Sequence, residues 1–192
     1  MFILSLVGSN LFTSWQLGKL RDENAKLSKE LGRLVISDPT KINVIAVPTY
    51  EDMLWRWRIH VPKGSGPLHL FTVTQDVPEN GFPANSGSSG PFRDGEYLLT
   101  AAIRPDRNGK WQLTIAGPQS SFSMGIAEAA AAWLGDSPGY STEQAGASGT
   151  QVADPGERLA LLRIRAMKRT SPTSSSSAPG PADGVMIWLA KP

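Results

Sequence analysis

Apolar and polar residues alternate along much of the chain after residue 38, and this period of two predicts β-strands. In residues 54–61, Trp55 and Trp57 fall on one face of the expected strand while Arg56 and Arg58 fall on the other. The remaining strand candidates share β-branched or aromatic residues and turn-rich borders. They are residues 42–47, 68–77, 96–103, 110–115, 158–167 and 185–189.

The spacing of these segments predicts a mainly β domain over residues 38–192. Asn108 followed by Gly109 is typical of a hairpin turn between two strands. Short strands without βαβ alternation favour an antiparallel β-sandwich or a partly open barrel. Residues 123–134 could form a short helix. Stretches rich in Gly, Ser and Pro are expected to be flexible loops, namely 78–95, 135–156 and 170–184.

Residues 18–36 show a different period, because their leucines recur every three and four positions. This heptad pattern predicts a short coiled-coil stalk, and Asn24 at an a position favours a parallel pair of helices. The alternative is a single amphipathic helix that lies on its own β domain. The seam of the coiled coil would consist of Leu17, Leu20, Asn24, Leu27, Leu31 and Leu34.

Residues 1–17 are apolar enough to contact a membrane, although a spanning helix needs about 20 mainly apolar residues. The segment looks like the C-terminal part of a spanning helix, as would follow from a start codon assigned too late. The alternative is an apolar segment packed on the domain. Lys19, Arg21 and Lys26 follow the segment, and the positive-inside rule alone would keep the β domain in the cytoplasm.

Composition narrows the function classes only slightly. The chain has 192 residues, a formal net charge of +2 and no cysteine. The small charge gives no indication of nucleic-acid binding. The absence of cysteine excludes disulfides, thiol catalysis and thiolate metal sites, and it leaves the compartment open.

The polar residues predict no catalytic, cofactor or metal site. His60 and His69, on successive predicted strands, could approach Asp76 and form a minimal metal site, but their spacing fits no metal-binding motif. No nucleophile elbow, phosphate-binding loop or dinucleotide-binding fingerprint is present. The sequence therefore favours a protein that is not an enzyme, with a hydrolase of unknown type as a remote alternative.

Four arginines suggest a binding surface instead. Arg56, Arg58, Arg163 and Arg165 fall on the polar faces of their predicted strands. If those strands are neighbours, the side chains would form a basic sheet face suited to an anionic glycan or a lipid headgroup. The alternative is an ordinary polar outer surface, because arginine is compatible with strands through its apolar stem. The two cases differ in whether the four side chains share one exposed face.

The chain resembles uncharacterised bacterial membrane-anchored proteins that carry a short coiled coil followed by a β domain. The resemblance rests on ENAKLSKELGRL, on VIAVPTYEDMLWRWRIHVP, on ERLALLRIRAMKR and on the closing DGVMIWL. It implies a single-pass membrane protein with an extracytoplasmic β domain, and it brings no activity or cofactor. We therefore expect an interaction or structural module of the cell envelope, with a possible homodimer through the heptad and an unknown protein or anionic polymer as partner.

Overall fold

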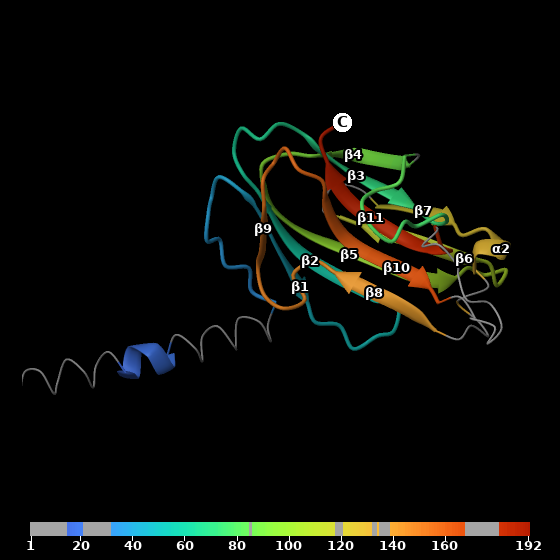
Figure 1. Cartoon of the computed structure of the whole chain (residues 1–192), viewed down its shortest axis with the longest axis horizontal. Helices are drawn as coiled ribbons and strands as arrows, with labels where there is room; N and C mark the ends of the chain where they lie inside the picture. Colours follow the sequence, from blue (N-terminus) through green and yellow to red (C-terminus); the bar gives the residue numbers. More distant parts are fainter. Residues whose placement is uncertain are drawn as a thin grey trace, which may run out of the picture.

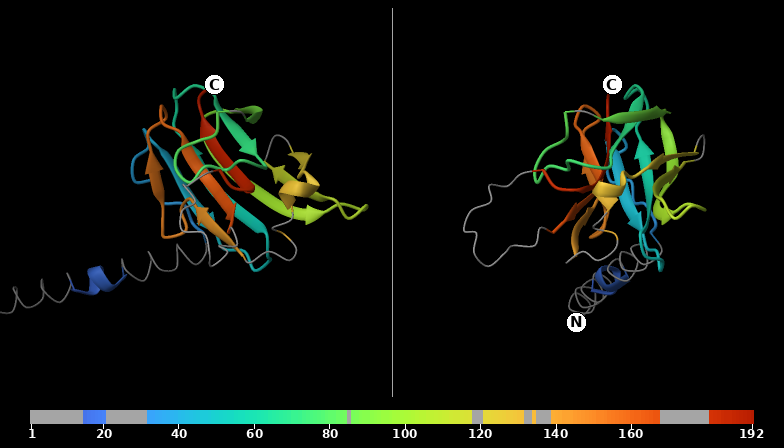
Figure 2. Two further views of the ribbon diagram at one scale, coloured as in Figure 1. Left: turned by 45° about the vertical axis from the view of Figure 1, so that its right-hand side comes forward. Right: turned by 90° about the vertical axis from the view of Figure 1, so that its right-hand side faces the viewer.

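A computed structural model describes residues 15–20, 32–84, 86–117, 121–131, 134, 139–167 and 181–192 of the chain. Most of these residues belong to β-strands, which form two antiparallel sheets (Figures 1 and 2). The strands are β1 (Ile42–Val47), β2 (Leu54–Val61), β3 (Leu68–Val73), β4 (Gly87–Phe92), β5 (Gly95–Pro105), β6 (Trp111–Ala116), β7 (Ser121–Gly125), β8 (Tyr140–Gln144), β9 (Gln151–Ala153), β10 (Leu159–Ala166) and β11 (Gly184–Ala190).

The six-stranded sheet has the order β7-β6-β5-β2-β1-β9, and the five-stranded sheet has the order β4-β3-β11-β10-β8. The chain passes repeatedly from one sheet to the other. After β2 it forms β3 and β4 in the five-stranded sheet and then returns to the six-stranded sheet as β5. There β5 pairs with β2 along the whole length of β2, from Leu54 opposite Ala102 to Val61 opposite Gly95. This crossing brings segments distant in sequence side by side and packs the two sheets face to face as a β-sandwich. The mainly β fold with antiparallel sheets is thus confirmed.

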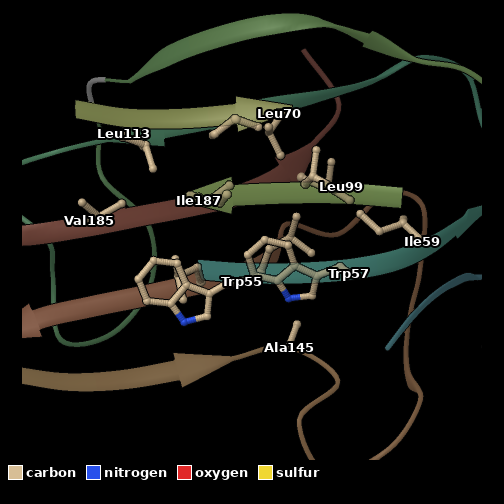
Figure 3. Close-up of a cluster of buried hydrophobic side chains, with 14 of the residues drawn as sticks. Trp55, Trp57, Ile59, Leu70, Leu99, Leu113, Ala145, Val185 and Ile187 are labelled. Carbon is tan, nitrogen blue, oxygen red and sulfur yellow. The ribbon is translucent and has the colours of Figure 1, made fainter. Parts of the chain in front are cut away.

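The core lies between the sheets and is built from the apolar positions of the alternating pattern. Trp57 and Ile59 of β2 are fully buried, and they lie near Leu70 and Ile187 from the opposite sheet (Figure 3). Each alternate residue of β2 points outward, as Arg56 and Arg58 do. Burial of these side chains between two sheets supplies the main free energy that holds the domain together.

Strand β11 is buried on both faces. All seven of its residues are inaccessible to solvent or nearly so, which agrees with its unbroken apolar sequence. Ile187 joins the core between the sheets, whereas Met186 and Trp188 join a second, smaller apolar cluster on the outer face of the five-stranded sheet. An outer face that buries a tryptophan must be covered by another segment of the chain.

Two of the predicted loops contain strands. Residues 78–95 include β4, and residues 135–156 include β8 and β9, so the expectation of flexible loops there is wrong. Both predictions failed because β4 and β8 are rich in Gly, Ser and Thr, β9 has only three residues, and none of them has an apolar period. Within residues 123–134, the structure shows the end of β7 and a short helix, α2 (Glu128–Ala131). Residues 170–180 of the third predicted loop lie outside the described residues.

The predicted N-terminal helix is described only in part. Residues 15–20 are helical, whereas residues 32–36 are not. Gly32 has a φ of 59°, a conformation that commonly ends helices. The predicted anchor at residues 1–14 and the coil at residues 21–31 lie outside the described residues. In the part of the chain that the structure describes, no helix has the length and apolar character needed to cross a membrane.

Candidate functional site

The four arginines of the predicted basic face lie in two different sheets. Arg56 and Arg58 belong to β2 of the six-stranded sheet, and Arg163 and Arg165 belong to β10 of the five-stranded sheet. In both strands the arginines alternate with core residues and point away from the opposite sheet. The prediction of one shared basic face is therefore wrong, because local periodicity fixes the side of a strand but not the sheet that the strand joins.

The outer face of the six-stranded sheet is accessible around β2 and β5. We call the surface formed by Arg56, Arg58, Glu96, Leu98 and Thr100 the open face. Its Arg58 Nη1 lies 3.4 Å from Glu96 Oε1, and both side chains are about half exposed. Leu98 beside them is 48% exposed. The open face thus combines both charges with an exposed apolar side chain, which suits a protein partner better than a polyanion.

A second ion pair borders the open face at the far end of β5. Arg104 pairs with Glu51, and both side chains are more than half exposed. Exposed pairs of this kind contribute only about 0–1 kcal/mol to stability. Their main consequence is electrostatic, because the two carboxylates offset two of the three guanidiniums and leave the surface only slightly positive.

Residues 32–41, which we call the tether, cross the outer face of β1. The Asn43 side chain is fully buried, and its Nδ2 donates hydrogen bonds of 2.8 Å to the carbonyl oxygens of Asp38 and Lys41. At the other end of the tether, Gly32 packs so closely on Val47 that an added Cβ would lie 2.8 Å from the Val47 Cα. The tether therefore fixes the point at which the N-terminal segment leaves the domain.

A turn at Asp38 closes the tether. The Thr40 hydroxyl and the Thr40 N–H both donate to Asp38 Oδ1, at 2.6 and 2.9 Å. These hydrogen bonds hold the pKa of the Asp38 carboxyl below its ordinary value, and the nearby Lys41 charge acts in the same direction. The Asp38 carboxyl therefore stays ionised, and accepts both hydrogen bonds, until the pH falls through this lowered pKa. The stability that these hydrogen bonds contribute is lost as the pH falls through that range.

The predicted coiled-coil seam is described at three of its positions. Leu17 and Leu20 lie in the helical residues 15–20 and are 50% and 57% exposed, and Trp15 beside them is 65% exposed. Leu34 lies in the tether, which is not helical, so its assignment to the seam is wrong. Asn24, Leu27 and Leu31 fall outside the described residues.

The end of the predicted strand 68–77 and the beginning of the predicted loop 78–95 lie on the outer face of the five-stranded sheet. We call residues 76–84 the strap. Arg163 of β10 attaches the strap to the sheet. Its Nη1 donates to the Glu79 carbonyl at 3.1 Å, and its Nη2 donates to the Gly81 carbonyl at 2.8 Å. The same Nη1 lies 2.9 Å from Glu143 Oε2, and the Arg163 side chain is only 12% exposed. Arg163 thus acts as a structural clamp, because the strap and Glu143 engage both of its terminal nitrogens.

Apolar contacts under the strap complete this attachment. The Phe82 ring lies 5.8 Å from the Trp188 ring, which in turn stacks on Phe71 at 5.6 Å. Val77 forms a β-bridge with Ala182, with N–O distances of 2.8 and 3.0 Å. The strap therefore covers the second apolar cluster. The sequence contains a signal for it, since Val77 and Phe82 are apolar residues in a Gly- and Asn-rich stretch, but that signal does not identify what they cover.

The two histidines, which were considered as a possible minimal metal site, lie in different sheets. His60 belongs to β2 of the six-stranded sheet and His69 to β3 of the five-stranded sheet, so the strands do not neighbour each other. Asp76 is exposed in the strap. Among the described residues, no group of three His, Cys, Asp or Glu side chains is placed to hold a metal ion.

A shallow hollow of about 450 Å³ lies between the β2–β3 and β4–β5 turns. Its wall is formed by Gly64, Ser65, Gly66, Pro67, Pro91, Arg93 and Asp94. Arg93 and Asp94 are both exposed. The hollow therefore lacks the convergent, desolvated polar groups that are typical of an active site.

The chain matches no protein-family model, no curated protein and no solved structure. The resemblance to membrane-anchored proteins therefore stays a prediction. The features of the molecule that bear on function are the exposed helical leucines, the tether, and the difference between the open face and the face that the strap covers.

Proposed function

We propose that this protein is a non-enzymatic display module, in which a β-sandwich is raised from a membrane on a helical stalk that pairs with a second copy. The observation that carries the proposal is the exposure of Leu17 and Leu20, at 50% and 57%, in the helical residues that precede the domain. The main apolar cluster of the domain includes neither leucine. Two apolar side chains at heptad spacing need a partner, and a second stalk is the partner that the heptad pattern favours.

The stalk is so short that its pairing would depend on attachment to a membrane. Because Leu34 lies in the tether, the heptad pattern ends by residue 31 and spans only about two heptads, and helices this short are marginal in water. Anchoring at residues 1–17 would raise the effective concentration of neighbouring chains and favour pairing. We propose, in line with the resemblance, that the β domain lies on the extracytoplasmic side.

The open face is our candidate for the surface that such a module presents. The strap covers part of the outer face of the opposite sheet, whereas Arg56, Arg58 and Leu98 on β2 and β5 are exposed. The tether lies beside the open face on β1, so a partner bound there would sit close to the point where the stalk leaves the domain. The proposed partner is a protein whose surface offers both charges and an apolar contact.

Disulfide cross-linking tests the paired stalk, because the chain has no cysteine of its own. Leu20→Cys places a thiol at a d position, and Lys19→Cys places one at the neighbouring c position, which faces away from the seam. In the full chain reconstituted in vesicles, we expect Leu20→Cys to form disulfide dimers about tenfold faster, since a disulfide tolerates only Cα separations of roughly 4.4–6.8 Å.

Lys19→Cys is the matched control for random collisions in the membrane, since both side chains are exposed in the same helical turn. Non-reducing electrophoresis after mild oxidation measures the two rates. Equal rates for the two variants, or no dimer with either, would contradict the paired stalk.

A further inference from the structure

The strap contains a sequence that is chemically reactive. Asn80 is followed by Gly81, and both residues are exposed. In an Asn-Gly pair, the glycine nitrogen meets little steric hindrance when it approaches the preceding side-chain amide. The chain has a second such pair at Asn108 and Gly109, in the turn between β5 and β6.

The two pairs differ in how the attacking nitrogen is held. The Gly109 N–H donates to the Asp106 carbonyl at 3.0 Å, and the Asn108 N–H donates to Asp106 Oδ1 at 2.8 Å. The Gly81 N–H donates to no residue that the structure describes. Attack at Asn108 therefore requires the Gly109 N–H to give up its hydrogen bond to the Asp106 carbonyl, whereas the Gly81 N–H has no such hydrogen bond to lose among the described residues.

We propose that Asn80 is a site of spontaneous deamidation that releases the strap. The Gly81 nitrogen attacks the Asn80 side-chain carbon Cγ and forms a cyclic imide, while the Cγ–N bond breaks and ammonia leaves with the proton from the Gly81 nitrogen. Water then opens the ring at either carbonyl. The net reaction consumes one water, releases one ammonia, and leaves aspartate or isoaspartate at position 80.

The isoaspartate product alters the strap where Arg163 grips it. The guanidinium binds the carbonyls of Glu79 and Gly81, one on each side of Asn80. Isoaspartate adds a methylene to the main chain between these carbonyls, so they no longer match the fixed fork of the guanidinium. Ordinary aspartate keeps the main-chain spacing, and its charge is compatible with a neighbouring arginine. Release of the strap is therefore a property of the isoaspartate form.

Peptide mapping by mass spectrometry tests the site. The folded full chain is incubated at mildly alkaline pH, and deamidation at positions 80 and 108 is followed over time, with isoaspartate distinguished by fragmentation. We expect position 80 to react several-fold faster than position 108. In denaturant the two rates should converge, because both asparagines precede glycine. Equal rates in the folded chain, or a faster reaction at position 108, would overturn the proposal.

Limited proteolysis tests the consequence. A glutamate-specific protease is used because Glu79 is an exposed residue of the strap. We expect aged wild-type protein to be cut at Glu79 several-fold faster than fresh protein, and aged N80Q to be cut at the fresh rate. N80D, which carries the charge without the added methylene, should also retain the fresh rate. If aged wild type and aged N80Q are cut equally fast, deamidation does not release the strap.

Discussion

Replacing Trp57 with alanine is expected to lower the free energy of unfolding by about 3–5 kcal/mol. Trp57 is fully buried between the sheets, in the middle of β2, and Ala145, Leu99 and Leu70 lie around it (Figure 3). Removing the indole leaves a cavity that the neighbouring strands can fill only in part. Because small domains are stable by about 5–15 kcal/mol, the variant should be partly unfolded at moderate temperature. Urea denaturation followed by circular dichroism measures the loss.

Trp57→Phe gives a more specific result. The indole Nε1 of Trp57 is buried and has no hydrogen-bond partner among the described residues. An unpaired buried donor costs about 1–3 kcal/mol, and phenylalanine removes that donor while it keeps most of the apolar volume. We therefore expect Trp57→Phe to lie within about 1 kcal/mol of the wild type.

Leu98→Ala is the control for the Trp57 variants. Leu98 lies on the adjacent strand β5 but is 48% exposed, so its loss should change stability by no more than about 0.5 kcal/mol. A loss below about 1 kcal/mol for Trp57→Ala would show that the core is not packed around this residue.

Replacing Arg163 with alanine is expected to detach the strap and to lower the free energy of unfolding by about 1.5–3 kcal/mol, the range for hydrogen bonds that involve a charged group. The variant loses the bonds to the carbonyls of Glu79 and Gly81 and the ion pair with Glu143. Once the strap is free, the contact between Phe82 and Trp188 is lost as well. Limited proteolysis at Glu79 should therefore become faster by more than the change in global stability explains.

Two further arginine variants test whether the strap depends on the planar guanidinium of Arg163 or only on its positive charge. Arg163→Lys keeps the charge but offers no planar fork, so we expect it to recover part of the stability and little of the protection of the strap. Arg56→Ala removes an exposed arginine from β2, a central strand of the opposite sheet, and should leave proteolysis at Glu79 unchanged. An Arg163→Ala protein with wild-type proteolysis would mean that the strap is held without Arg163, by the Val77–Ala182 bridge and the contacts of Phe82.

The sequence predicted the central strands well, because their apolar residues alternate. The predicted bounds of residues 42–47 and 54–61 agree with β1 and β2 in the structure. Trp57 was predicted on one face of its strand and Arg56 on the other, and the structure confirms this alternation, with Trp57 buried and Arg56 exposed. The β-sandwich class follows from these segments, since short alternating strands must bury one face each.

Strands β4, β8 and β9 could not be predicted from local sequence. All three lie at the edge of a sheet and have mostly exposed residues, so they carry no apolar period. They form strands because a neighbouring strand offers unpaired backbone groups. The same limit explains the error over the arginines, since β2 and β10 show similar patterns but join different sheets. The strap was missed because only the folded chain brings Phe82 next to Trp188.

The central claim, a β-sandwich displayed on a paired stalk, is tested most directly by the solution mass of the full chain. Light scattering in detergent across a concentration series should give the mass of a dimer for the wild type and of a monomer for a variant with both Leu20→Ser and Leu27→Ser. Leu34→Ser is the control and should remain a dimer, because Leu34 lies in the tether and not in the helix. A wild-type chain that stays monomeric even at the highest ratio of protein to detergent, where chains share micelles, or a double variant that still dimerises, would contradict the account.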